Sequence, residues 1–236
     1  MLRALLSPEA QVQPLRDGVV TVLPPDRRAA AYDRLAPGYD LLVGSRIYNR
    51  LVWGSSPAHY AQLAATALIE GHGPALDVGA GSLVFTAEIY AATARPLILT
   101  DLSGAMLGRG ARRLASKGRA IQTRRHLLLQ ADAAALPLRD HTFDTVMSWG
   151  FLHLFHDPAP LLAELRRVTA PGGRVHLSVL TLGGGAGDAV LRRLEARGEV
   201  YAAAPAYWLG AVRRGGLEVT DRAQEGHLLS LSAALR

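Results

Sequence analysis

Residues 75–86, Ala-Leu-Asp-Val-Gly-Ala-Gly-Ser-Leu-Val-Phe-Thr, join a short apolar strand to an acid, then to two glycines, then to a predicted helix. A turn of this kind brings backbone N–H groups close to a ligand at a helix N-terminus. Position 84 is Val84, so the dinucleotide pattern G-x-G-x-x-G is incomplete, and the lysine of a phosphate-binding loop is absent. Asp77, two residues before Gly79, favours an ammonium or a ribose hydroxyl over a pyrophosphate. Without further context, the two glycines predict only a tight strand-to-helix turn.

A second strand-end acid follows at a suitable distance. Residues 96–102 form an apolar run that ends in an acid, Asp101, which lies 22 residues after Gly79. This is about where a ribose-binding carboxylate is expected, although an acid here also suits a helix N-terminus. Ser103 is a candidate N-cap, and the apolar spacing over 103–117 predicts a helix.

The remaining elements of an α/β domain follow in order. They are a strand at 127–130 leading to a turn at 131–133, a strand at 143–149, a helix opening at Asp157-Pro158, a turn at 171–173 and a strand at 174–180. Alternation of buried strands with amphipathic helices predicts a Rossmann-like parallel sheet covered by helices on both faces.

Over residues 30–182, this series resembles the class I S-adenosylmethionine-dependent methyltransferases. Their first motif is usually D-x-G-x-G-x-G, and here Leu83 replaces the third glycine. Residues 32–40 and 148–158 are similar to the quinone-biosynthesis C-methyltransferase branch and its small-molecule relatives. That branch usually has two adjacent histidines where His153 is followed by Leu154.

The resemblance implies S-adenosylmethionine as cofactor and a role for each residue that matches a family motif. These are Tyr32 and Tyr39 in a lid, Asp77 for the ammonium, Gly79 and Gly81 beside the methionine part, Asp101 for the ribose, Leu102 and Met106 against the adenine, Asp132 and Ala133 at the adenine edge, and Ser148 and Trp149 at the methionine end. His153 is the first candidate general base because a histidine with a near-neutral pKa suits proton removal, and His156 and Tyr39 are the other two candidates. Asp132 also fits a simple turn residue, and His153 also fits a capping residue.

The predicted organisation is an N-terminal appendage (1–27) followed by a methyltransferase domain (28–236). Within the domain we expect a helical lid (28–70), a cofactor-binding core (73–182) and a substrate-side insert with closing strands (183–236). The appendage has the pattern of a turn and a short strand, and it faintly resembles the tail of a zinc ribbon that has lost its cysteines. Helices at 188–198 and 204–214 and an antiparallel strand pair at 217–220 and 228–231 complete a seven-stranded, mostly parallel sheet.

The amino-acid composition excludes several kinds of site and indicates where the protein works. The 236 residues contain no cysteine, which removes disulfides, thiolate metal sites and cysteine nucleophiles, and we expect no metal. No run of 18 apolar residues occurs, so we expect no membrane span and a cytoplasmic protein. The net charge of +6 comes almost entirely from arginine, since Lys117 is the only lysine. Arginine pairs scattered along the chain fit a solvated surface or, less simply, an RNA-binding surface.

Aromatic residues gather in two segments outside the predicted sheet, 32–60 and 201–208. We expect them to roof an apolar pocket, or simply to pack helices on the core. The predicted function is methyl transfer to a small hydrophobic acceptor. Methylation of RNA, a catalytically silent cofactor-binding or interaction protein with Leu83 crowding the site, and a nicotinamide oxidoreductase remain as alternatives in that order.

Overall fold

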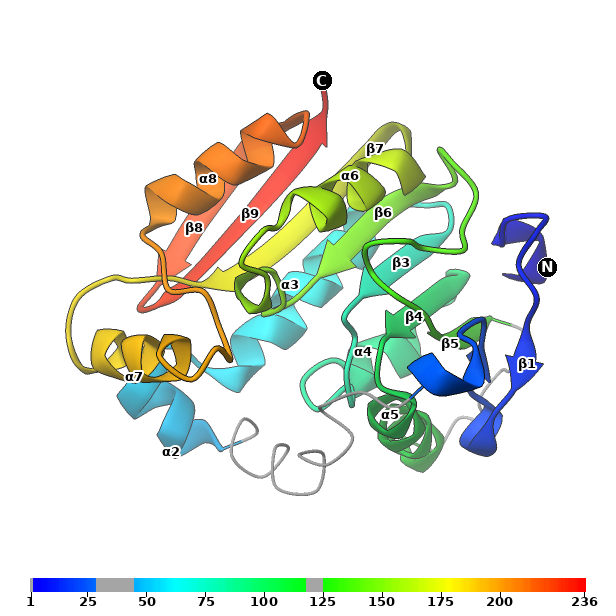
Figure 1. The fold of residues 1–236 in the computed structure, drawn as a ribbon, viewed down its shortest axis with the longest axis horizontal. Helices are drawn as coiled ribbons and strands as arrows, with labels where there is room; N and C mark the ends of the chain where they lie inside the picture. Colours follow the sequence, from blue (N-terminus) through cyan, green and yellow to red (C-terminus); the bar gives the residue numbers. More distant parts are fainter. Residues whose placement is uncertain (1, 29–44, 118–124) are drawn as a thin grey trace.

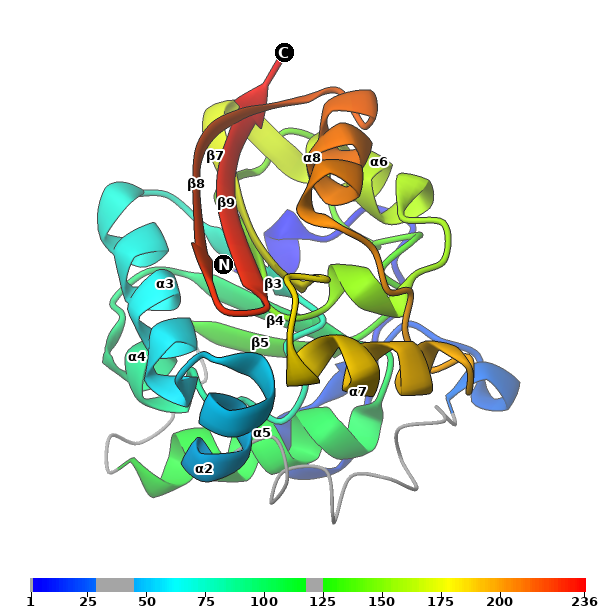
Figure 2. The same ribbon diagram turned by 90° about the vertical axis from the view of Figure 1, so that its left-hand side faces the viewer.

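A computed structural model describes residues 2–28, 45–117 and 125–236 of the chain. Within these ranges the centre of the molecule is one twisted sheet with helices on both faces (Figures 1 and 2). The same ranges contain no helix with the length and apolarity needed to cross a bilayer.

The sheet has the strand order β1-β2-β5-β4-β3-β6-β7-β9-β8. The strands are β1 (Gln13–Pro14), β2 (Val20–Thr21), β3 (Ala75–Val78), β4 (Leu97–Asp101), β5 (His126–Gln130), β6 (Phe143–Ser148), β7 (Thr169–Leu180), β8 (Leu217–Glu225) and β9 (Leu228–Leu235). Strands β2 to β7 pair in parallel, and β9 runs antiparallel to both β7 and β8. The chain adds β4 and β5 on one side of β3 and returns to β6 on the other side. A topological switch point therefore lies between β3 and β6, where ligands of α/β sheets bind beyond the carboxyl ends of the strands.

The predicted number of seven strands is wrong, because the described chain forms nine. The two additional strands, β1 and β2, come from the N-terminal appendage, and β2 pairs in parallel with β5 through Val20–Leu129 and Thr21–Gln130. An unpaired β5 would expose a row of backbone hydrogen-bonding groups at the sheet edge, and β2 satisfies part of that row. Each added strand is only two residues long, so neither has a periodicity that a sequence pattern reveals.

Helices cover the sheet in two layers. They are α2 (Arg46–Tyr48), α3 (Pro57–Glu70), α4 (Ala87–Ala92), α5 (Gly104–Ser116), α6 (Ala159–Val168), α7 (Ala186–Glu195) and α8 (Pro205–Arg214). Short 3-10 segments occupy Leu2–Leu5, Arg16–Gly18, Pro25–Arg27 and Leu152–Leu154, and a π-helical turn spans Asn49–Trp53. Figure 2 shows α3, α4 and α5 on one side of the sheet and α6 and α8 on the other. The helices predicted at 188–198 and 204–214 correspond to α7 and α8.

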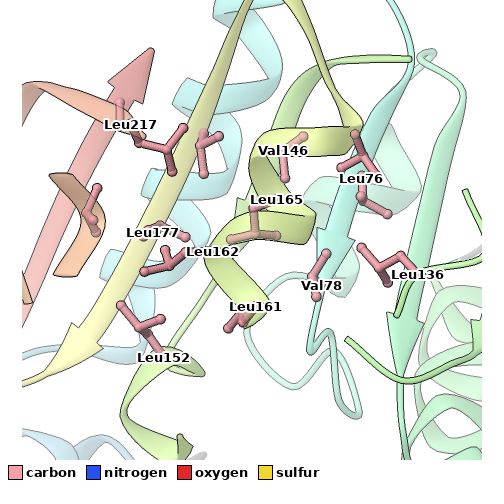
Figure 3. Packing of buried hydrophobic residues seen from close by; sticks show 14 of the residues in the cluster. Leu76, Val78, Leu136, Val146, Leu152, Leu161, Leu162, Leu165, Leu177 and Leu217 are labelled. Carbon is pink, nitrogen blue, oxygen red and sulfur yellow. The ribbon is translucent and has the colours of Figure 1, made fainter. Parts of the chain in front are cut away.

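Period-two alternation along the central strands divides the core between these layers. Leu76 and Val78 of β3 belong to the cluster that contains α6 and α8, whereas Ala75 belongs to the cluster that contains α3, α4 and α5. In Figure 3 the apolar face of α6, with Leu161 and Leu165, lies over the side chains of the central strands. Both faces of β3 are therefore dry, and its carboxyl end is held rigidly where the candidate site begins.

Candidate functional site

A cavity of about 290 Å³ lies at the carboxyl ends of β3, β4 and β6. Its walls are formed by the residues that follow these three strands and by the start of α5. They are Asp77, Gly79, Ala80, Gly81, Ser82, Leu83, Val84, Phe85, Thr86, Asp101, Leu102, Ser103, Met106, Trp149, Gly150, Phe151, Leu154 and Phe155. The cavity thus coincides with the glycine turn and with both strand-end acids.

The glycine turn depends on glycine for different reasons at its two ends. Gly79 has φ 76° and donates its N–H to the carbonyl of Thr100 at 2.9 Å. A Cβ at Gly79 would lie 2.4 Å from the ring of Phe151, closer than side chains tolerate. Gly81 has φ 57°, but a Cβ there would meet nothing closer than Met106 Cε at 3.7 Å. Gly79 is therefore required by both conformation and space, whereas Gly81 is required by its conformation alone, because a Cβ there would make only ordinary van der Waals contacts.

Leu83, the residue that departs from the glycine-rich pattern, adopts the backbone conformation that a glycine would take. Its φ is 57°, which is uncommon for leucine, and its side chain is buried in the cluster of α3, α4 and α5. A Cβ added to Gly110 of α5 would lie 2.9 Å from Leu83 Cγ. The missing side chain of Gly110 thus makes room for the leucine, which packs on α5 while it also contributes to the cavity wall.

Asp101 ends β4, and backbone donors hold its carboxylate. Oδ2 accepts the N–H of Gly81 at 2.8 Å, and Oδ1 accepts the N–H of Ser103 at 2.8 Å. Ser103 is the N-cap of α5, as the sequence predicts, since its Oγ accepts the N–H of Met106 at 3.1 Å. A carboxylate oxygen has more than one lone-pair site, so it can accept a second donor besides a backbone N–H.

Asp77, the penultimate residue of β3, lies in a different environment. Its Oδ2 accepts the hydroxyl of Tyr90 at 2.7 Å, whereas its buried Oδ1 has no hydrogen-bond partner among the described residues. Burial raises the pKa of Asp77 to about 7; the Tyr90 hydrogen bond opposes this shift and the nearby Asp101 charge adds to it. A buried carboxylate oxygen without a donor fits a ligand that brings a positive charge or an N–H group.

The predicted adenine contacts divide into two groups. Leu102 and Met106 line the cavity, and Leu102 is 44% exposed although it is a large apolar residue. Asp132 and Ala133 do not line it. The carboxylate of Asp132 accepts from Arg27 of the appendage at 3.1 Å and from the N–H of Ala134 at 2.9 Å.

Of the site residues predicted in and after β6, only one lines the cavity. Trp149 lines the cavity, whereas buried Ser148 donates to the carbonyl of Val78 at 2.8 Å and joins β6 to β3. His153, the candidate base, is buried and does not line the cavity; its Nδ1 lies 3.4 Å from the N–H of Leu180. Burial lowers the pKa of His153 to about 4, so the ring is neutral near pH 7. Tyr32 and Tyr39 lie outside the described residues.

An aromatic wall faces the glycine turn, but it comes mostly from residues that sequence reasoning missed. Phe85, Phe151 and Phe155 line the cavity beside Trp149. Phe151 and Phe155 pack edge to face with ring centroids 4.9 Å apart, and Tyr60 of α3 stacks on Phe85 at 4.7 Å. The signal available in the sequence was the aromatic i,i+4 pair just after the strand at 143–149.

The second predicted aromatic segment does not roof this cavity. Trp208 is fully buried, and Tyr201 and Tyr207 pack against it and against the core beside α6 and β9. The buried face of α8 points toward the sheet, so these rings are core residues. The alternative interpretation of this segment as helix packing is the one that fits.

Comparison with known proteins agrees with this geometry. Residues 76–177 match the family described as "Methyltransferase domain", and this range contains the glycine turn, both strand-end acids and the aromatic wall. This part of the chain, residues 76–177, is similar to a class I methyltransferase domain. S-Adenosylmethionine is the cofactor of that class, and solved structures of the same fold contain it.

Curated relatives of this methyltransferase domain include enzymes of quinone biosynthesis. Demethylmenaquinone methyltransferase of Renibacterium salmoninarum is 32% identical over 153 residues, which is 64% of this chain and 57% of that protein. The ubiquinone/menaquinone biosynthesis C-methyltransferase UbiE of Burkholderia mallei is 33% identical over 151 residues, 62% of this chain and 57% of that protein. The chain thus spans less than two thirds of the length of either relative.

Solved structures share the fold at low identity. The [4+2]-cyclase SpnF superposes with a TM-score of 0.69 at 17% identity, over 86% of this chain and 92% of that chain. Geranyl diphosphate methyltransferase in complex with SAM gives a TM-score of 0.62 at 13% identity, over 76% of this chain and 85% of that chain. Because these neighbours differ in chemistry, the fold does not identify the reaction, and the site has to supply that argument.

Proposed function

We propose that this chain transfers a methyl group from S-adenosylmethionine to a small apolar acceptor. The observation that carries the proposal is the pairing of Asp77 and Asp101 on one wall of a cavity whose other wall is aromatic. The curated relatives, a demethylmenaquinone methyltransferase and a ubiquinone/menaquinone biosynthesis C-methyltransferase, support the same class of acceptor.

The polar wall fits the cofactor. The unpartnered Oδ1 of Asp77 suits the ammonium of the methionine part, and the carboxylate of Asp101 suits the ribose hydroxyls. Gly81 lines the cavity and has no side chain, so a ligand can approach its backbone closely. Leu102 and Met106 offer apolar contact for the adenine, and an exposed Leu102 is explained if a ring covers it.

S-Adenosylmethionine supplies an electrophilic methyl group on a sulfonium. The residues of this chain then have to orient the acceptor and exclude water, and alignment alone contributes up to ~7–11 kcal/mol of barrier lowering in favourable cases. Phe151 and Phe155, with Trp149, form the wall that would hold an apolar acceptor beside the methionine end. His153 would have to leave Leu180 to reach the cavity, so the simpler proposal is that alignment drives transfer of the methyl group from sulfur to the acceptor, S-adenosylhomocysteine leaves as the neutral thioether, and the acceptor loses its proton to water.

RNA methylation is the second candidate, motivated by the net charge of +6. Several members of the arginine pairs are already engaged within the chain. Arg27 is paired with Asp132, Arg112 with Asp17, and Arg167 with both Glu164 and Asp140. These intramolecular pairs favour a structural use of arginine over a phosphate-binding surface.

The test has two stages. Calorimetry with S-adenosylmethionine and S-adenosylhomocysteine measures binding first, and absence of binding at millimolar ligand would overturn the proposal. Transfer of a tritiated methyl group is then measured to reduced demethylmenaquinone, to small alkylated phenols and to bulk tRNA. We expect transfer to the apolar acceptors, whereas transfer to tRNA together with steeply salt-dependent binding would favour the RNA alternative.

A further inference from the structure

Tyr90 connects the two walls of the cavity without lining it. It lies on α4 and is fully buried. Its hydroxyl donates to Asp77 Oδ2 at 2.7 Å and accepts the indole N–H of Trp149 at 3.0 Å. The carboxylate that would bind the ammonium and the indole of the aromatic wall are therefore joined by one phenol.

The direction of this chain of hydrogen bonds is fixed by the groups in it. An indole nitrogen only donates, so the Tyr90 oxygen must accept from Trp149. When Asp77 is ionised, the single phenolic proton is then available for its carboxylate, and Tyr90 is the donor. With Oδ2 engaged in this way, the unpartnered oxygen is Oδ1.

We propose that Tyr90 is a positioning residue, which orients the Asp77 carboxylate so that Oδ1 receives the ammonium of the cofactor, with Trp149 holding the phenol in place. The inference rests on the proposed function. It assigns to a residue outside the cavity a selective effect on one part of the cofactor, the amino-acid end.

Charge and burial around Asp77 make the effect measurable. The groups facing Asp77 are the Tyr90 hydroxyl and the Asp101 carboxylate, and Thr86 together with Trp149 faces Tyr90. The hydrogen bond from Tyr90 lowers the pKa of Asp77, against the stronger effect of burial. Removal of the hydroxyl moves the pKa of Asp77 further upward and leaves less carboxylate at neutral pH.

The experiment compares two ligands on wild type and Tyr90→Phe by calorimetry between pH 6 and pH 9. S-Adenosylhomocysteine carries the ammonium, and 5′-methylthioadenosine lacks the whole amino-acid part. We expect Tyr90→Phe to weaken S-adenosylhomocysteine about 10-fold or more, as for loss of a hydrogen bond to a charged group, and to leave 5′-methylthioadenosine within about 3-fold. The pH at which S-adenosylhomocysteine affinity rises should also move upward in the variant.

A second variant guards against a folding defect. Trp149→Phe keeps an aromatic wall but removes the donor that orients the phenol, so we expect the same ligand selectivity with a smaller loss. Equal weakening of both ligands by Tyr90→Phe, or no weakening of either, overturns the inference. Failure of wild type to bind either ligand overturns the proposed function instead, so the two failures are distinguishable.

Discussion

Asp77 and Asp101 lie at the carboxyl ends of neighbouring strands of the same sheet, yet the fold surrounds their carboxylates in opposite ways. Backbone N–H groups of Gly81 and Ser103 satisfy Asp101, and these donors are fixed by the glycine turn and the start of α5. Asp77 accepts a hydrogen bond from a single side chain, the hydroxyl of Tyr90, and its other oxygen has no partner among the described residues. Burial raises the pKa of Asp77 to about 7. Both oxygens of Asp101 therefore have a backbone donor, whereas one oxygen of Asp77 has no donor among the described residues. Under the proposed function, the ammonium of the cofactor would bind at the Asp77 end of the cavity and the ribose at the Asp101 end.

The largest expected effect concerns the turn that connects the two ends. Gly79→Ala places a methyl group at φ 76° and against the ring of Phe151, so we expect a loss of roughly 2–5 kcal/mol in the free energy of unfolding. Gly81→Ala is the matched control, because it meets only backbone strain of about 1–2 kcal/mol. Urea unfolding of both variants measures the difference. Equal losses would show that Phe151 does not pack against Gly79.

Asp101→Ala tests the role proposed for the Asp101 carboxylate at its end of the cavity. It removes the acceptor of two backbone N–H groups and the proposed ribose acceptor, and each hydrogen bond to a charged group is worth ~1.5–3 kcal/mol. We expect S-adenosylhomocysteine affinity to fall by about 10–100-fold. Adenosine, which carries the ribose but no ammonium, should lose affinity by a similar factor in calorimetry. A loss confined to S-adenosylhomocysteine would contradict the division of the cavity into two ends.

The buried carboxyl group of Asp77 should change how the free energy of unfolding of the ligand-free protein depends on pH. The pKa of Asp77 rises from 3.8 to about 7 on folding, so its contribution is fully present below pH 3.8 and is lost as pH rises through 7. Buried His153 and His176 act oppositely, because folding lowers their pKa from 6.5 to about 4 and their contributions are lost as pH falls. Comparing wild type with Asp77→Asn isolates the first effect. The stability of wild type relative to the variant should fall between pH 4 and pH 7.5 in urea titrations, and a rise over that range would refute the environment described for Asp77.

The smallest effect concerns Leu83, which replaces a motif glycine between the two ends. Gly110→Ala would bring a methyl group 2.9 Å from Leu83 Cγ, and we expect destabilisation of about 1–3 kcal/mol. Gly108→Ala on the same helix would meet the carboxylate of Asp17 at 3.0 Å and Arg112 at 3.7 Å. Both atoms belong to the ends of side chains paired with each other at the surface, so we expect a smaller change than at position 110, within about 1 kcal/mol. A double-mutant cycle with Leu83→Ala should give a coupling energy for position 110 and none for position 108. Thermal or urea unfolding provides the measurement.

Prediction from sequence succeeded where a local pattern carries the structure. The strand at 75–78 is a dry apolar run on both faces, and Ser103 caps α5 because its side chain bonds three residues ahead. It predicted a short strand in the appendage, which corresponds to β2, but it did not predict β1 or the pairing of β2 with the edge of β5, because that pairing joins residues more than 100 positions apart. Rings at 201–208 were ambiguous, since an aromatic residue that faces a ligand and one that faces the core have the same sequence signature.

The sequence by itself determined that an acid and a glycine turn follow one buried strand and that a second acid follows the next. These features are local, because apolar runs, glycines at positive φ and an N-cap act within a few residues of one another. Only the tertiary structure decided that Tyr90 donates a hydrogen bond to Asp77 and accepts one from Trp149. It also decided that the missing side chain of Gly110 leaves room for Leu83. Those contacts join residues from different helices and strands, and their partners are chosen by the packing of the sheet and its helices.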